Sequence, residues 1–152
     1  MRLSVFNQAG QLVAVDLPRV VKSDAEWRQQ LTPAQFTVAR GKGTERPFCG
    51  TLLDNKRDGV YTCICCNLPL FSASGKFHSG TGWPSFFQPI AEENVATETD
   101  TSHGMVRVEI LCARGDGHLG HVFEGERLTP KDTRHCVNSL SLRFVPAARS
   151  GA

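Results

Sequence analysis

The sequence lacks long hydrophobic runs, and this absence excludes two classes of protein. No apolar stretch approaches the ~20 residues that a helix needs to cross a bilayer, so we expect no membrane segment. The first twenty residues also lack the apolar centre of a signal peptide, because Gln8, Gln11 and Asp16 interrupt their apolar positions. We therefore expect a soluble, cytoplasmic protein that is not exported.

An excess of charge of one sign is missing as well. The chain has 17 lysines and arginines against 15 aspartates and glutamates, which gives a formal net charge of +2. Nucleic acids and anionic membranes attract concentrated positive charge, so we expect neither as a partner. The 152 residues, 40% of them apolar, have the length of one ordinary domain, and we expect residues 1–152 to form a single domain.

Cysteine is too sparse and too unevenly spaced for a disulfide scaffold, with six residues in the whole chain. In a cytosolic protein of this size, such cysteines bind metal, take part in catalysis or are simply buried. The surroundings of each cysteine therefore decide how it is interpreted.

Helix signals are confined to the first third of the chain. Ser23 with Glu26 forms a capping box, and Thr32 with Gln35 forms a second one, followed by proline at the first helical position. Two short helices are predicted to begin at these caps. Residues 1–18 alternate weakly around a turn, which predicts a hairpin.

Beyond residue 43 the pattern predicts short strands separated by turns. Residues 88–104 are polar and without a strong period, so we expect a long connection there. Residues 106–110 alternate between apolar and charged, which predicts a half-buried strand with Val106, Val108 and Ile110 inward. Residues 147–152 are expected to form a frayed tail.

Residues 134–144 carry the clearest strand pattern. A period of two places Arg134, Cys136 and Asn138 on the same face as the apolar residues that follow. The core would then open at one end into a polar pocket containing a thiol. A cysteine beside an arginine is expected to have a lowered pKa and to act as a nucleophilic thiolate. A buried structural cysteine, with Arg134 reaching solvent, is the alternative.

Two other clusters could contribute to such a pocket. His118 and His121 lie three residues apart around a glycine, a spacing that can turn both imidazoles toward one site for proton transfer. Metal ligation and surface placement are the alternatives. Glycines and a proline surround Trp83 and could hold its indole rigidly at a pocket wall, unless the ring simply packs in the core.

The remaining cysteines suggest a metal site that is one ligand short. Cys63 and Cys66 form a CxxC pair and Cys112 could begin a second pair, but Gly115 stands where a fourth cysteine would be. Three thiolates make a poor closed zinc site. The residues that could supply a fourth ligand are Asp116, His118 and Cys65.

Five segments in a fixed order carry a family resemblance. They are TERPF (44–48), KFHSGTGWPSF (76–86), GMVRVE (104–109), HLGHVF (118–123) and RHCVNS (134–139). In this order they resemble the methionine sulfoxide reductase B family. The match runs from about residue 23 to residue 144, which leaves residues 1–22 as an N-terminal extension.

The resemblance implies reduction of the R epimer of methionine sulfoxide, bound in peptides and proteins rather than free. It also implies a mainly β fold with two small antiparallel sheets, tent-like in arrangement, and short N-terminal helices. The implied nucleophile is Cys136, and the implied wall for the substrate's methyl group is Trp83. His118 and His121 are implied as the proton-donating and water-holding pair that binds the substrate. Asn138 and Arg134 are implied as the residues that orient this pair and favour the thiolate. Chemistry agrees, because a sulfoxide sulfur becomes electrophilic as its oxygen is protonated, which requires a thiolate, an acid and an apolar socket.

The resemblance further implies a second, resolving cysteine. Attack would leave a sulfenic acid on Cys136, which another thiol must convert to a disulfide before a reductant, thioredoxin in this family, restores the enzyme. Many members have that cysteine where this chain has Thr81. Relatives with threonine there often have cysteine at the position of Cys49, which implies a Cys49–Cys136 disulfide. An incidental thiol is the alternative for Cys49.

The chain departs from the family pattern at two places. Gly115 replaces a zinc ligand and implies the zinc-free branch, in which no cofactor is required. The cysteines left behind, as packed small residues or as a pair able to form a disulfide, would be Cys63, Cys65, Cys66 and Cys112. After Phe123 the usual Asp-Gly-Pro turn is replaced by residues 124–127, EGER, so the substrate-side loop is expected to differ.

Other functions remain open from the sequence. A zinc-ribbon-like interaction module would explain the CxxC pair but not the two histidines. A hydrolase could use Cys136, a histidine and Asn138 for acyl transfer, but would have little use for a resolving thiol. An inactive redox sensor of the same fold is a third possibility. For the reductase we expect a monomer, with methionine-R-sulfoxide in proteins as substrate and thioredoxin as reductant.

Overall fold

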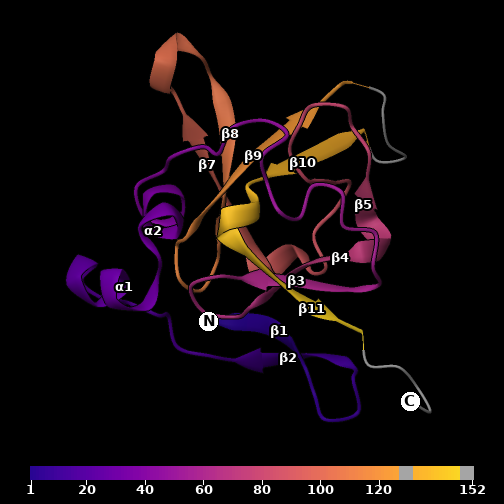
Figure 1. Ribbon diagram of the computed structural model, residues 1–152. Helices are drawn as coiled ribbons and strands as arrows, with labels where there is room; N and C mark the ends of the chain where they lie inside the picture. The colour runs from indigo at the N-terminus through magenta and orange to yellow at the C-terminus, as the bar shows by residue number, and fades with distance from the viewer. Residues whose placement is uncertain (127–131, 148–152) are drawn as a thin grey trace.

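The computed structural model describes residues 1–126 and 132–147 (Figure 1). Over these residues the chain is mainly β, with two short helices near the N-terminal end and antiparallel strands elsewhere, which confirms the predicted class. Neither helix in the described ranges is long and apolar enough to cross a membrane. Arg127, expected in the substrate-side loop, and residues 148–152 of the expected tail lie outside the described residues.

Within residues 1–126 and 132–147, the strands form three antiparallel sheets. The two-stranded sheet pairs β1 (Arg2–Phe6) with β2 (Leu12–Asp16). The three-stranded sheet has the order β11-β3-β4 and contains β3 (Gly59–Cys63), β4 (Pro69–Ser72) and β11 (Leu142–Pro146). The six-stranded sheet has the order β5-β6-β10-β9-β8-β7 and contains β5 (Lys76–Phe77), β6 (Ser85–Phe86), β7 (Val95–Asp100), β8 (Arg107–Cys112), β9 (His118–Glu124) and β10 (Thr133–Val137).

The two α-helices begin where the capping signals predicted. The helices are α1 (Asp24–Gln30) and α2 (Pro33–Ala39), and the 3-10 turns are η1 (Ala73–Gly75), η2 (Glu92–Asn94), η3 (Ser102–Gly104) and η4 (Ser139–Ser141). Both capping boxes form, so each N-cap hydroxyl accepts a hydrogen bond from a backbone N–H that the first turn would leave unpaired. The predicted hairpin forms as well, with β1 and β2 paired along their whole length.

Aromatic side chains fill the core between the six-stranded and three-stranded sheets. Phe86 of β6 stacks on Phe71 of β4 with ring centroids 4.4 Å apart, and meets the edge of Tyr61 of β3 at 5.1 Å. Trp27 brings the face of α1 into the same apolar cluster. Aromatic pairs of this kind add about 0.5–1.5 kcal/mol each beyond the area they bury. The result is a rigid base beneath β9 and β10.

The segment 134–144 does not form one strand, so this prediction was wrong. β10 ends at Val137, η4 follows, and β11 then belongs to the other sheet. The pattern misleads because Ser139 and Ser141 are buried, although the period of two placed them outside. The Ser139 hydroxyl accepts from the backbone of Leu52, and the Ser141 hydroxyl donates to the carbonyl of His118, which makes these polar groups stable inside.

One further expectation for the sheet was wrong, and a second was confirmed only in part. The polar segment 88–104 is not a plain connection, since it contains β7, an edge strand whose mostly exposed residues pair with β8 throughout. The half-buried strand predicted at 106–110 forms as β8 with Ile110 buried, but the valines do not point inward: Val106 is 81% exposed, whereas Glu109 is 3% exposed. Glu109 can be buried because His118 and Lys42 lie within ion-pair distance of its carboxylate.

Candidate active site

A cavity of about 150 Å³ lies where β9 and β10 meet the loops that follow α2 and precede β6. Five of the seven side chains predicted for the site line this cavity. They are Cys136, His121, Trp83, Asn138 and Arg134. His118 and Cys49 do not line it, so the structure gathers most of the predicted site but not all of it.

Strand pairing sets the thiol beside an imidazole. Cys136 of β10 lies directly opposite His121 of β9 and opposite Ser85 of β6. Gly120 allows this close approach, because a Cβ atom there would lie 1.8 Å from the carbonyl oxygen of Cys136. Cys136 is half-buried, so its sulfur is not sealed in the core. The thiol and the imidazole are therefore positioned by the sheet rather than by a loop.

A β-bulge brings the two histidines together. Residues three apart on a regular strand point to opposite faces. Here Ile110 of β8 pairs with Gly120 and Leu111 pairs with His118, so Leu119 is the extra residue of the bulge. The rings of His118 and His121 consequently meet edge to face, with centroids 5.7 Å apart.

His118 lies one layer behind the thiol cavity. Its Nδ1 atom is 2.6 Å from a carboxylate oxygen of Glu109, and it borders a second, polar cavity that also touches His121. Burial lowers the pKa of His118, an effect that the Glu109 carboxylate opposes. Within the described residues, its Nε2 atom has no hydrogen-bond partner. His118 is therefore placed to support His121 rather than to touch a ligand next to Cys136.

Asp100 holds the second histidine in place. Its carboxylate lies 2.7 Å from Nε2 of His121 and accepts a hydrogen bond from the backbone of Ser102. The pKa of Asp100 is lowered, first by Ser102 and then by His121, so the group is ionised at neutral pH. His121 itself lines the thiol cavity, so the imidazole that Asp100 holds borders the space next to Cys136. In the sequence, Asp100 falls within the expected connection 88–104, and nothing in its neighbourhood marks a catalytic motif.

Backbone contacts fix Trp83 at the cavity wall. Its indole N–H donates to the carbonyl of Glu45 at 2.9 Å. Gly82 precedes it with φ +96, and a Cβ atom there would lie 2.6 Å from the ring of Pro47. The backbone N–H of Phe48 donates to the carbonyl of Gly82 at 2.7 Å. The indole is half-buried and held from two sides, which suits a rigid apolar wall.

Asn138 ties the cavity walls together. Its side-chain oxygen accepts from the backbone N–H of Glu45 at 3.0 Å, and its amide donates to the carbonyl of Leu119 at 3.1 Å. Leu119 is the bulge residue between the two histidines, so Asn138 acts on their placement through the backbone. It does not hold an imidazole directly, as the third member of a hydrolase triad would.

The expected lowering of the pKa of Cys136 was wrong in its net direction. Burial raises the pKa of this thiol, and the nearby Arg134 guanidinium lowers it only in part. Arg134 itself is held by both oxygens of Glu126, at 2.7 and 3.1 Å, and lies over the ring of Phe123. The bidentate pair fixes the guanidinium beside the thiol. Arg134 therefore stabilises the thiolate and burial destabilises it, and the effect of burial on the pKa is the larger one.

Cys49 lies outside the thiol cavity, on an exposed part of the loop between α2 and β3. It borders a neighbouring groove, and the two hollows share Thr44 as a wall. Phe48, just before it, has φ 66, a left-handed conformation that is unfavourable for an aromatic residue. The backbone of Phe48 is tied to Gly82, next to Trp83, so this loop adjoins the site that Cys49 would have to reach.

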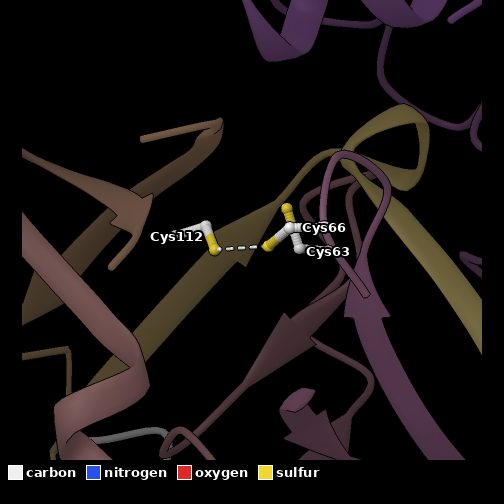
Figure 2. A group of neighbouring side chains, drawn as sticks. All are labelled: Cys63, Cys66 and Cys112. Carbon is white, nitrogen blue, oxygen red and sulfur yellow. Dashed lines mark hydrogen bonds between the residues drawn. The ribbon is translucent and has the colours of Figure 1, made fainter. Parts of the chain in front are cut away.

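Three other cysteines gather where β3 and β8 end. Cys63, Cys66 and Cys112 bring their sulfur atoms within 4.8 Å of one another (Figure 2). Gly115 lies beside them, with its Cβ position 3.7 Å from the sulfur of Cys66, and offers no ligand. Within the described part of the chain, the group has these three members. A closed four-thiolate zinc centre therefore does not fit the residues that are present.

Comparison with known proteins decides the family. Residues 31–146 match the SelR domain family. The chain belongs to this family. Among curated proteins, the peptide methionine sulfoxide reductase MsrB of Hahella chejuensis is 56% identical over 131 residues, covering 86% of this chain and 94% of that protein. The enzymes of the same name from Pseudomonas entomophila and Pseudomonas putida (strain W619) are 52% and 50% identical, covering 86% and 90% of this chain and 98% and 100% of those proteins.

Membership of the SelR family confirms the resemblance stated from the five motifs. The motifs account for the thiol, indole and imidazole around the cavity. The polar residues that support them, which sequence reasoning missed, are Asp100, Glu109, Glu126 and Thr44. Glu109 could have been suspected, because a charged residue in an apolar strand requires a partner when buried.

Proposed function

We propose that this SelR-family chain reduces the R epimer of methionine sulfoxide in peptides and proteins, with Cys136 as the nucleophile. The observation that carries this proposal is that Cys136, His121 and Trp83 line one cavity. Such a cavity offers a nucleophile, a proton donor and an apolar wall to a single small group. The names of the relatives, which describe peptide methionine sulfoxide reductases, agree with this chemistry.

The reaction begins with a proton and a thiolate on the two sides of the sulfoxide. His121, held by Asp100, protonates the sulfoxide oxygen, which makes the sulfur electrophilic. The S-methyl group rests against the indole of Trp83. The Cys136 thiolate, favoured by Arg134, attacks, methionine leaves, and the oxygen remains on Cys136 as a sulfenic acid. Cysteine is oxidised and the sulfoxide is reduced, and no cofactor is required.

A second thiol would complete the cycle. The thiol of Cys49 attacks the sulfenic acid, so that a Cys49–Cys136 disulfide forms and water leaves. The sulfur of Cys49 must first move from its groove into the thiol cavity. Release of the Phe48 backbone from its left-handed conformation would favour such a movement of the loop. Thioredoxin, itself a dithiol, then reduces the disulfide, and the protein acts as a monomer of one domain, residues 1–152, with residues 1–22 as an N-terminal extension.

The test separates the nucleophile from the resolving thiol. A peptide carrying either the R or the S sulfoxide is incubated with the wild-type protein, Cys136→Ser and Cys49→Ser. We expect reduction of the R epimer by the wild type, none by Cys136→Ser, and about one methionine per Cys49→Ser molecule without thioredoxin-driven turnover. Cys65→Ser, a buried thiol outside the cavity, is the matched control and should retain activity.

Specific outcomes would contradict each part. Near-normal activity of Cys136→Ser, or reduction of the S epimer alone, would reject the proposed nucleophile or substrate. Unchanged thioredoxin-driven turnover by Cys49→Ser would reject Cys49 as the resolving thiol while leaving the reduction step intact. Peptide mapping of the oxidised wild type should show the Cys49–Cys136 bond.

A further inference from the structure

Two arginines line the thiol cavity, and they differ in how their hydrogen-bond donors are used. The guanidinium of Arg134 donates to both oxygens of Glu126 and lies over the ring of Phe123. The guanidinium of Arg107 meets one acceptor among the described residues, Oδ2 of Asp100, at 3.5 Å. Its Nε atom is buried and has no hydrogen-bond partner within the same residues. Arg107 therefore brings unused donors to the cavity, whereas Arg134 does not.

The contact between Arg107 and Asp100 does not satisfy the guanidinium. Its length of 3.5 Å exceeds the usual range of N–H···O bonds, about 2.7–3.2 Å. The same oxygen of Asp100 already lies 2.7 Å from Nε2 of His121. The side chain of Arg107 is 25% exposed, so water reaches little of it. A buried N–H without an acceptor costs free energy, and a bound acceptor in the cavity would remove this cost.

The strand register fixes where Arg107 lies relative to the reacting groups. Cys136 of β10 is opposite His121 of β9, and His121 is opposite Glu109 of β8 (Figure 1). Arg107 comes two residues before Glu109 on β8, so the two side chains share a face of the sheet. Two residues of a strand span about 6.8 Å. The side chain of methionine sulfoxide covers a similar length from its sulfur to its main-chain carbonyl oxygens. A substrate sulfur placed at the thiol therefore brings its peptide groups within reach of Arg107.

We propose that the guanidinium of Arg107 donates hydrogen bonds to a main-chain carbonyl oxygen of the substrate, and so selects a sulfoxide within a peptide over one without peptide groups. This inference rests on the proposed function, because the position of the sulfur at Cys136 determines where the peptide lies. A neutral carbonyl suits this place better than a carboxylate, because the Asp100 carboxylate already lies beside Arg107. Arg107 thus determines specificity and takes no part in oxygen transfer.

The experiment measures binding to Cys136→Ser, which lacks the nucleophile, by isothermal titration calorimetry. The probes are the R epimers of N-acetyl-methionine sulfoxide N-methylamide, which has peptide groups, and of methyl propyl sulfoxide, which is the bare side chain. The amide should bind with a Kd lower by about tenfold or more. Adding Arg107→Gln should raise the Kd of the amide by about tenfold and change that of methyl propyl sulfoxide by less than about twofold. Arg143→Gln, which removes an exposed guanidinium from β11, is the matched control and should change neither value.

Two analogues of the amide identify the carbonyl, one without the acetylamino group and one without the N-methylamide group. Loss of the responsible carbonyl should abolish the effect of Arg107→Gln, and an effect that persists with both analogues would overturn the proposal.

Equal Kd values of the amide and methyl propyl sulfoxide on Cys136→Ser would also overturn it, and this comparison does not require Arg107→Gln to fold. Equal weakening of both probes by Arg107→Gln would show that Arg107 acts only through Asp100, against the proposal. Reduction is assayed separately on the wild type. If the amide bound through Arg107 but was not reduced, the reductase proposal would fail and the role of Arg107 in binding would stand.

Discussion

The thiol cavity and the three-cysteine group place sulfur in opposite surroundings. Cys136 stands among groups of other kinds: a guanidinium, an imidazole and an indole border the same small cavity. Cys63, Cys66 and Cys112 bring their sulfur atoms within 4.8 Å of one another, with Cys63 and Cys112 buried and Cys66 half-buried. A single thiol with a cation and an acid beside it suits attack on a small molecule, whereas several thiols facing one point suit an ion.

Glycines provide the strongest test of this comparison, because one stands beside each site. Gly120→Ala would force a Cβ atom against the carbonyl oxygen of Cys136 and push β9 away from β10. We expect a loss of about 3 kcal/mol in the free energy of unfolding, a Tm lower by about 6–12 °C, and no measurable reduction of sulfoxide. Thermal unfolding by circular dichroism and the peptide assay measure these effects.

Gly115→Ala is the matched substitution beside the three-cysteine group. Its Cβ atom would make ordinary contacts, so the unfolding free energy should stay within about 0.5 kcal/mol of the wild type and activity should be unchanged. If Gly120→Ala and Gly115→Ala lowered the unfolding free energy equally, the close approach of β9 and β10 at Gly120 would not be a special requirement of the thiol cavity.

The elements predicted well from the sequence are those whose signals are local. Capping boxes begin both helices, because the paired side chains are three residues apart in the chain. The strand that was predicted over residues 134–144 failed because Ser139 and Ser141 find backbone partners on distant segments. Cys136, Trp83 and His121 could be selected from motifs. Asp100 could not, since its role depends on the pairing of β7 with β8, a contact between strands that periodicity does not reveal.

The thiol cavity also differs from the three-cysteine group because a carboxylate, that of Asp100, holds the imidazole of His121 in place. Asp100→Asn keeps the shape but removes the negative charge that stabilises a protonated ring. We expect kcat to fall by about tenfold or more, with little change in KM. A general acid contributes about 10²–10⁴-fold to the rate, and loss of the supporting carboxylate should remove a part of this factor. Because Ser102 and His121 lower the pKa of Asp100, its carboxylate is charged throughout pH 6–9, and the loss in kcat should persist across this range.

The control for this substitution is Glu98→Gln, which removes an exposed charge from the same strand and should leave kcat and the pH profile unchanged. Steady-state kinetics with the R-sulfoxide peptide between pH 6 and 9 measure both variants. If Asp100→Asn retained the rate and the profile of the wild type, Asp100 would be a structural residue of the β7–β8 hairpin alone.

The smallest expected effect concerns the charge beside the nucleophile. Burial raises the pKa of Cys136 and Arg134 opposes this, so Arg134→Gln should raise the pKa further and leave less thiolate at neutral pH. Alkylation of Cys136 by iodoacetamide, followed by mass spectrometry of its peptide, should slow severalfold at pH 8 and recover at higher pH. Arg134→Lys preserves the charge and should slow it less. Alkylation of Cys112, which is buried away from Arg134, should not change in either variant, and a parallel change there would indicate general loosening rather than loss of a local charge.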